Sequence, residues 1–265
     1  MWPVLFKLGP LTIYSYGTMM AIAFLVGGSL ARREMNRKAM NGDLASSMVF
    51  WAAVGGIVGS RLWAVAEDWR SFLEHPSSMI FSGAGFVWYG GLLGGTLAVS
   101  WVIRRHRLPW ARVVDCIAPG LALAHGIGRI GCQLAGDGDW GSVSDLPWAM
   151  AYPNAIVGWD YAPGVRVHPT PIYETIGYTL IFAFLWSMRK RPHPDGTLFW
   201  WYLVLASSAR FAVEFVRIND PSLFGLTDPQ LVSIVLVAIG AWRLLVGSTE
   251  VVPPPTRKAA RSASR

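Results

Sequence analysis

The chain has 265 residues, of which 53% are hydrophobic and 15% are charged, whereas a soluble domain carries about 25% charged residues. This balance, with 14 tryptophans, excludes an ordinary water-soluble domain and is typical of a protein that meets bilayer interfaces repeatedly. The formal charge of +7 could indicate a nucleic-acid partner. The basic residues, however, lie in short loops between apolar runs and form no aromatic-interleaved groove, so no nucleic acid is expected.

Apolar stretches long enough to cross a bilayer follow one another along most of the chain. A membrane-spanning helix needs about 20 mainly apolar residues. Seven stretches meet this requirement, and they cover residues 11–31, 46–66, 80–103, 112–130, 171–188, 197–216 and 229–247. The sequence therefore predicts an all-α membrane protein with about seven transmembrane helices, built as one polytopic domain over residues 1–247.

Basic loops alternate with loops that are poor in Lys and Arg. The basic ones follow the first, third and fifth stretches, at residues 32–38, 104–107 and 189–191. Because short loops rich in Lys and Arg stay in the cytoplasm, we expect the N-terminus outside and the C-terminus in the cytoplasm. Residues 248–265 are basic and rich in Pro, Ala and Ser, which predicts a disordered cytoplasmic tail.

The connection between the fourth and fifth stretches is not a simple loop. It covers about residues 135–168 and is rich in Gly, Pro, Asp and Trp. Connections of that length without periodicity are usually functional or disordered, and the aromatic content argues against disorder. We expect a small extracytoplasmic cap.

Ionisable side chains within apolar stretches are costly and indicate a functional interior. With the expected orientation, Arg61, Arg129 and Arg210 all lie toward the outer ends of their stretches. Tyr16 and Tyr89 lie at a similar depth. Asp115 is the exception, because it lies near an inner end, where it is expected to anchor its helix at the cytoplasmic surface.

Each of these residues also has a purely structural interpretation. Arg210 and Glu214 are spaced i, i+4 and could simply pair with each other. Arg61 could extend its guanidinium to the outer interface. Arg129 has glycines on both sides in HGIGRIGC, which leaves room for a ligand, so a functional role is favoured there. The glycines of YGGLLGG and AVGGIVGS are expected to serve close helix packing.

Several arginines at one depth indicate an anionic guest. Planar guanidinium groups hold phosphate through two parallel hydrogen bonds and stay charged at physiological pH. Membrane lipids with an anionic headgroup are the expected ligand. The histidines are scattered and have no spaced His or Cys partner, so neither a metal nor a cofactor is expected.

Four motifs, in this order, resemble those of the prolipoprotein diacylglyceryl transferase family. They are YGGLLGG at 89–95, GRIGCQLAGDGDWG at 128–141, HPTPIYE at 168–174 and RFAVEFVRIND at 210–220. The resemblance covers nearly the whole chain. It implies a bacterial enzyme of the cytoplasmic (inner) membrane that moves the diacylglyceryl group of phosphatidylglycerol onto the lipobox cysteine of a prolipoprotein signal peptide. A thioether forms, and glycerol phosphate leaves.

The same resemblance assigns roles to individual residues. Arg129 matches the signature arginine that contacts the phospholipid, and Arg210 matches the second essential arginine. Tyr16, Glu214 and Gly141 match the tyrosine of the first span, the glutamate after the second arginine and the glycine that closes the signature. Arg61 and Asp137 join the expected headgroup site, with Asp137 at or next to a glutamate position.

The chain also departs from the family pattern. Tyr89 and Cys132 stand where many members have a histidine and an asparagine, while Ala135 and Ala206 replace a second asparagine and a tyrosine. If that histidine is the base elsewhere, Tyr89 cannot act unchanged, because a free tyrosine has a pKa near 10. These departures leave open a paralogue of the same fold that binds or transfers a different lipid-derived group. A transporter of anionic solutes is disfavoured, because transporter sites lie near the bilayer midplane.

The group that removes the thiol proton is left undecided by the sequence. The possible bases are His125, Tyr89, Glu214 and Asp137. Alternatively, an arginine-rich field could lower the pKa of the substrate thiol enough to need no base.

Overall fold

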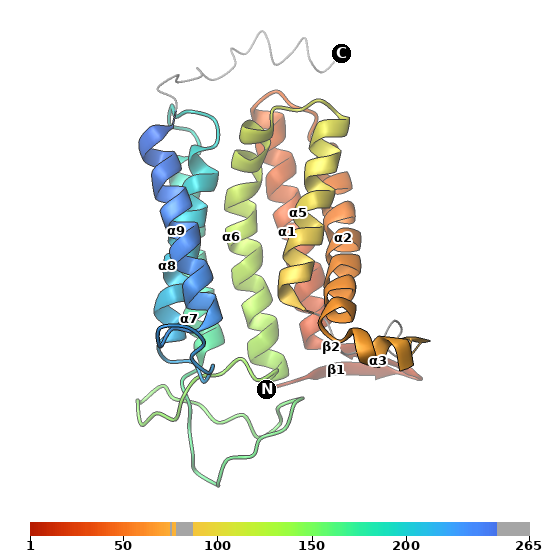
Figure 1. Cartoon of the computed structure of the whole chain (residues 1–265), viewed down its shortest axis with the longest axis vertical. Coiled ribbons are helices and arrows are strands. Elements are labelled where there is room, and N and C mark those ends of the chain that lie inside the picture. The colour runs from red at the N-terminus through yellow and green to blue at the C-terminus, as the bar shows by residue number, and fades with distance from the viewer. Residues whose placement is uncertain (75, 78–86, 248–265) are drawn as a thin grey trace. The chain divides into compact units, whose positions relative to one another are not determined.

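The computed structural model describes residues 1–74, 76–77 and 87–247, and a helix lies at each of the seven predicted stretches (Figure 1). The long helices are α1 (Ser15–Arg37), α2 (Leu44–Glu67), α5 (Trp88–Arg105), α6 (Trp110–Ala135), α7 (Thr170–Met188), α8 (Thr197–Glu214) and α9 (Asp228–Val246). A short helix, α3, covers Trp69–Glu74. The start of the third stretch and the predicted tail at 248–265 lie outside the described residues.

Among the described helices, three are long and apolar enough to cross a membrane by length and composition, namely α2, α6 and α9. They confirm the membrane character of the chain. The seven crossings and their orientation stay predictions.

The N-terminus adds a short β-hairpin to the helical fold. Two antiparallel strands, β1 (Val4–Leu8) and β2 (Leu11–Tyr14), precede the first helix. Gly9 adopts φ +58° at the turn between them, and β-branched and aromatic residues follow, which is a strand-and-turn pattern. The backbone N–H and the hydroxyl of Ser15 both donate to the carbonyl of Pro3. The first helix therefore begins at residue 15 and not at residue 11.

The chain forms two compact units, and one of them covers residues 32–113. Within it, α2 packs against α5 with their backbones in contact. An added Cβ on Gly55 would lie 2.6 Å from the carbonyl oxygen of Gly94 and 2.7 Å from the Cβ of Ala98. The packing role expected for these glycines is thereby confirmed.

The other unit contains residues 1–31 and 114–265 and has its core between α6, α7 and α8. The buried core residues are Ala118, Ala122, Tyr178, Ile181, Leu185, Leu198 and Ala206. In this unit the end of α6, the beginning of α7 and the end of α8 lie at the same end of the helices (Figure 1).

The segment between α6 and α7 has no long helix or strand, but the packing of its aromatic residues holds it in place. Trp140, Tyr152 and Val167 form a buried cluster. The hydroxyl of Tyr152 donates to Oε1 of Gln133 on α6 at 2.8 Å. Burial raises the pKa of Tyr152 to about 12, so this hydroxyl remains a donor at physiological pH.

Asp115 at the start of α6 has a different role from the surface anchor that was expected. Its side chain is buried, and its carboxylate accepts hydrogen bonds from the backbone N–H of Gly196 at 2.8 Å and of Phe199 at 3.0 Å. These groups belong to the first turn of α8, whose N–H donors have no partner inside the helix. Asp115 therefore caps α8 across 81 residues of sequence.

Replacing Asp115 should destabilise the fold measurably. Asp115→Ala leaves two buried N–H groups unpaired, which costs about 2–4 kcal/mol of unfolding free energy. The midpoint of thermal unfolding in detergent should fall accordingly. Asp145→Ala, at an exposed position, is the matched control and should change stability by under about 0.5 kcal/mol. Equal midpoints for the two variants would contradict the capping role.

Candidate functional site

Three arginines and three carboxylates meet where α6 ends, α7 begins and α8 ends. We call this group the arginine–carboxylate cluster, and its members are Arg129, Arg210, Arg217, Asp139, Glu174 and Glu214. All six residues belong to the unit that contains α6 to α9.

Glu174, in the first turns of α7, links the two arginines that the sequence singled out. Its Oε2 lies 3.2 Å from Nε of Arg129, and its Oε1 lies 3.3 Å from Nη1 of Arg210. Only 2% of the Glu174 side chain is exposed. The structure thus brings Arg129 and Arg210 together, although they come from different helices.

The other contacts fix each arginine on a second carboxylate. Arg129 pairs with Asp139 in the segment after α6. Arg210 pairs with Glu214 one turn along α8, with Nη2 and Oε2 2.8 Å apart. Glu214 also accepts hydrogen bonds from the hydroxyl of Thr227 at 2.9 Å and from the amide of Asn219. The i, i+4 pair is therefore present, but as one side of a larger network.

Three members of the cluster, Asp139, Glu174 and Arg217, were not identified as site residues from the sequence. Arg217 follows the end of α8. Its Nη2 lies 2.5 Å from Oδ1 of Asp139, and its Nη1 donates to the carbonyl of the same residue at 3.1 Å. Nη1 also lies 3.7 Å from Glu174. The spacing of seven residues from Arg210 would have placed both on one helix face, but the family pattern gave Arg217 no role.

The cluster is close to neutral, because three guanidiniums face three carboxylates. The side chains of Arg129 and Arg210 are 17% and 20% exposed, whereas those of Glu174 and Glu214 are buried. Charges fixed in this way cost little reorganisation when an anion arrives. An anionic group that reaches the exposed part of the Arg129 and Arg210 side chains would therefore meet fixed positive charge.

Two acidic residues in the segment after α6 differ in their electrostatics. Burial and the nearby Asp139 carboxylate raise the pKa of Asp137. Burial also opposes ionisation of Asp139, but the Arg129 and Arg217 guanidiniums outweigh it and hold the pKa of Asp139 below its usual range. Asp139 is thus a fixed anion at neutral pH, while Asp137 takes up a proton more readily than an ordinary aspartate.

Tyr16 and Gly141 lie near the cluster in different ways. Tyr16 on α1 packs over Gly131 of α6, where an added Cβ would lie 3.4 Å from the Tyr16 Cα. Gly141 donates its N–H to the carbonyl of His168 at 2.8 Å, and an added Cβ there would clash with the backbone of Val216. Close backbone packing explains this glycine, and its contact with a headgroup stays a prediction.

His125 lies one turn before Arg129 on α6 and has a packing partner. Its ring stacks on Tyr178 of α7, with centroids 3.8 Å apart and an interplanar angle of 14°. This contact supports the structural interpretation of His125. Arg61 and Tyr89 belong to the unit of residues 32–113, so their place in the site stays a prediction.

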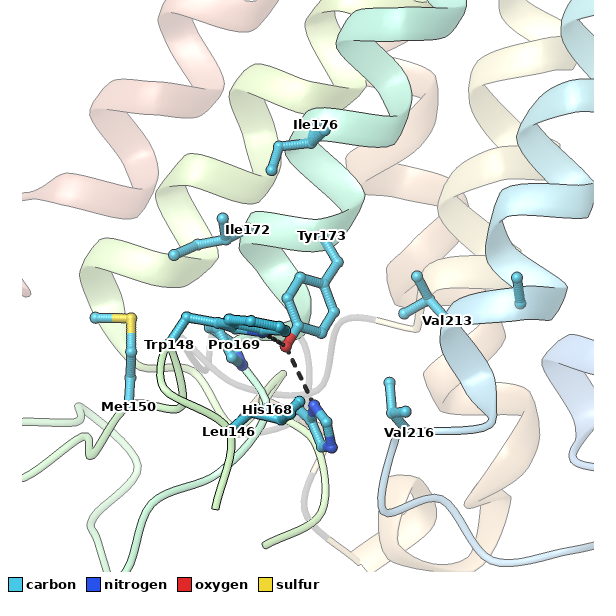
Figure 2. A pocket seen from close by; sticks show the side chains of 11 residues that line it. Leu146, Trp148, Met150, His168, Pro169, Ile172, Tyr173, Ile176, Val213 and Val216 are labelled. Carbon is cyan, nitrogen blue, oxygen red and sulfur yellow. Dashed lines mark hydrogen bonds between the residues drawn. The ribbon is translucent and has the colours of Figure 1, made fainter. Parts of the chain in front are cut away.

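A pocket of about 790 Å³ lies beside the same helix ends (Figure 2). Its lining is almost wholly apolar and includes Ile172 and Ile176 of α7. These two residues lie on the opposite face of α7 from Glu174, because each is two positions away at 100° per residue. At its edge, Trp148 donates to the Tyr173 hydroxyl at 2.8 Å, and that hydroxyl lies 3.1 Å from Nδ1 of His168. Ile172 and Ile176 therefore line the pocket from the face of α7 that is turned away from Glu174.

The fold and the site define a helical membrane protein with a buried arginine–carboxylate site at the ends of its helices. The chain belongs to the prolipoprotein diacylglyceryl transferase family, whose model matches residues 3–246. Three relatives, each named phosphatidylglycerol–prolipoprotein diacylglyceryl transferase, illustrate the similarity. Identity is 33% to the Clostridium tetani protein, with 91% of this chain and 95% of the relative covered. It is 32% to that of Synechococcus elongatus, with 99% and 94% covered, and 35% to that of Pseudomonas aeruginosa PAO1, with 83% and 82% covered.

Proposed function

We propose that this protein transfers the diacylglyceryl group of phosphatidylglycerol to the lipobox cysteine thiol of prolipoproteins, at the outer face of the bacterial cytoplasmic membrane. The observation that carries the proposal is the linkage of Arg129 and Arg210 through Glu174. Family membership and the names of the relatives support the same reaction.

The reaction needs a thiolate nucleophile and a group that neutralises the charge growing on the leaving phosphate. The cluster can meet the second need. The thiolate sulfur attacks the glycerol carbon that carries the phosphate, so a carbon–sulfur bond forms while the carbon–oxygen bond breaks. The electron pair of the broken bond stays on the phosphate oxygen, where negative charge grows. Arg129 and Arg210 are fixed cations whose side chains are 17% and 20% exposed, and such preorganised charge typically contributes several kcal/mol to the rate.

The orientation supports this placement. With the basic loops in the cytoplasm, the end of α6, the beginning of α7 and the end of α8 face outward. A phospholipid of the outer leaflet and an exported cysteine can meet there. Tyr16 and Gly141, which belong to the same unit as the cluster, complete the proposed headgroup site there.

A direct assay tests the proposal. Purified protein in detergent is given phosphatidylglycerol and a lipobox peptide, and the peptide mass is followed. We expect a mass gain of one diacylglyceryl group and release of glycerol phosphate. The Pseudomonas aeruginosa relative, assayed alongside, is the control, and an unchanged peptide mass with an active control would contradict the proposal.

The departures at Tyr89 and Cys132 favour one second function. A paralogue of the same fold would transfer a different lipid-derived group. The same assay distinguishes it, because a peptide that gains mass only from another phospholipid would support the paralogue.

A further inference from the structure

We propose that Asp137 is the general base that removes the thiol proton of the substrate cysteine, an inference that rests on the proposed function. It decides one of the alternatives that the sequence leaves open. In the step itself, the S–H bond breaks and its proton passes to a carboxylate oxygen of Asp137. The sulfur then attacks the glycerol carbon, and the phosphate leaves toward the guanidiniums of the cluster.

The position of Asp137 places a carboxylate beside the cluster but not within its ion pairs. Its carboxylate oxygen, a carboxylate oxygen of Asp139 and the Sγ of Cys132 all lie within 4.8 Å of one another. Among the described residues, no arginine or lysine lies within ion-pair distance of Asp137, whereas Asp139 is held by Arg129 and Arg217. Asp137 is therefore held by hydrogen bonds with the Cys132 thiol and the Asp139 backbone N–H and not by an ion pair, next to the fixed cations.

The other carboxylates near the site already form ion pairs with arginines. Glu174 and Glu214 are buried and paired with arginines, and Asp139 carries two of them. Taking up a proton there would break an ion pair in a poorly solvated place, which is costly. Asp137 is half-buried, so a substrate thiol can approach it.

The backbone around Asp137 also suits a group that must be presented to a substrate. Gly136 and Gly138 on either side adopt φ +63° and +93°, a conformation that side chains with a Cβ rarely adopt. This tight turn directs the chain from the end of α6 back to Asp139. The N–H of Asp139 donates to Oδ1 of Asp137 at 3.3 Å, which orients the carboxylate.

The electrostatics of Asp137 and Asp139 agree with different roles for the two carboxyl groups. Two neighbouring carboxyl groups whose pKa values are pushed apart commonly serve as proton acceptor and fixed anion. A pKa raised by burial and by Asp139 brings Asp137 closer to a thiol with pKa near 8.5. The ionisable groups that face Asp137 from all sides are Tyr16, Arg129, Cys132, Asp139 and Tyr152.

The test is Asp137→Asn, which keeps the shape of the side chain and removes its basicity. We expect kcat with the cysteine peptide at pH 7 to fall about 10²- to 10⁴-fold, with little change in KM. The variant should recover with rising pH, about tenfold per unit up to the thiol pKa near 8.5, because the peptide then ionises without help. The wild type should instead lose activity as the pH falls. This loss should begin at a higher pH than for an ordinary aspartate, because the pKa of Asp137 is raised.

A selenocysteine peptide separates base catalysis from a structural role. A selenol is ionised at neutral pH, so Asp137→Asn should use this peptide nearly as well as the wild type does. Asp160→Asn, at an exposed position in the same segment, is the matched control and should behave as wild type with both peptides. Asp137→Glu should retain part of the activity with the cysteine peptide.

The outcomes that overturn the inference are distinct from failure of the proposed function. Wild-type turnover of the cysteine peptide by Asp137→Asn would show that no base is needed there. Equal loss with both peptides at every pH would show a structural role. A wild-type protein that forms no adduct with phosphatidylglycerol, by contrast, would overturn the proposed function itself.

Discussion

Arg129→Ala should reduce kcat/KM for transfer to a lipobox peptide by about 10²- to 10³-fold or more, the loss seen when one preorganised group that stabilises developing charge is removed. The Arg129 side chain is 17% exposed, and its guanidinium is fixed between Glu174 and Asp139. It can therefore meet a phosphate without reorganising. The measurement is the initial rate of peptide mass gain over a range of phosphatidylglycerol concentrations.

Two companion variants show whether the geometry or only the charge matters. Arg129→Lys keeps the charge but loses the planar fork that binds carboxylate and phosphate through two bonds, so activity should remain well below wild type. Arg61→Ala should leave part of the activity, because Arg61 also has a structural interpretation as an interface residue. Wild-type turnover by Arg129→Ala would remove this arginine from the reaction.

The helices could be predicted from the sequence because each depends on a local property. About 20 apolar residues in a row indicate a membrane helix whatever their neighbours are, and a helix lies at every predicted stretch. The hairpin at residues 4–14 was missed because its second strand, Leu11–Tyr14, runs directly into the apolar stretch that was read as the first helix. There the turn at Gly9 and the alternation after it decide the structure, and they occupy only a few positions.

The site could be predicted only in part, for a related reason. An arginine within an apolar stretch is conspicuous, and Arg129 and Arg210 are indeed brought together. Their shared partner, Glu174, lies 45 and 36 residues away from them in the sequence, and no local pattern predicts such a pairing. Arg217 was overlooked because it follows α8 and its main partner, Asp139, comes from another segment.

Asp115, near the beginning of α6, is another residue whose partners are distant in the sequence and could not be predicted. Its position near the end of an apolar stretch suggested a solvated anchor. The carboxylate is instead buried and caps a helix that begins 82 residues later. A buried acidic residue needs partners for its oxygens, but the sequence does not say which backbone N–H groups will supply them.

Glu174→Gln should produce the largest loss of stability among substitutions in the cluster. The side chain is 2% exposed and lies within 3.7 Å of atoms of three arginines. The amide is nearly isosteric, so the change removes one negative charge and leaves three guanidiniums facing two carboxylates. Removing one partner of a buried ion pair costs about 3–5 kcal/mol, and we expect the midpoint of thermal unfolding in detergent to fall by roughly 6–20 °C.

Glu174→Gln also tests whether Arg129 and Arg210 bind the anionic headgroup. With one carboxylate neutralised, an anionic headgroup supplies the missing charge, so phosphatidylglycerol should raise the unfolding midpoint of Glu174→Gln more than that of the wild type. A neutral diacylglycerol with the same acyl chains should not. Glu67→Gln, at an exposed position on α2, is the matched control and should shift neither midpoint. Equal stabilisation of variant and wild type by phosphatidylglycerol would mean that the headgroup binds elsewhere, because the freed guanidiniums of Arg129 and Arg210 cannot then be its partners.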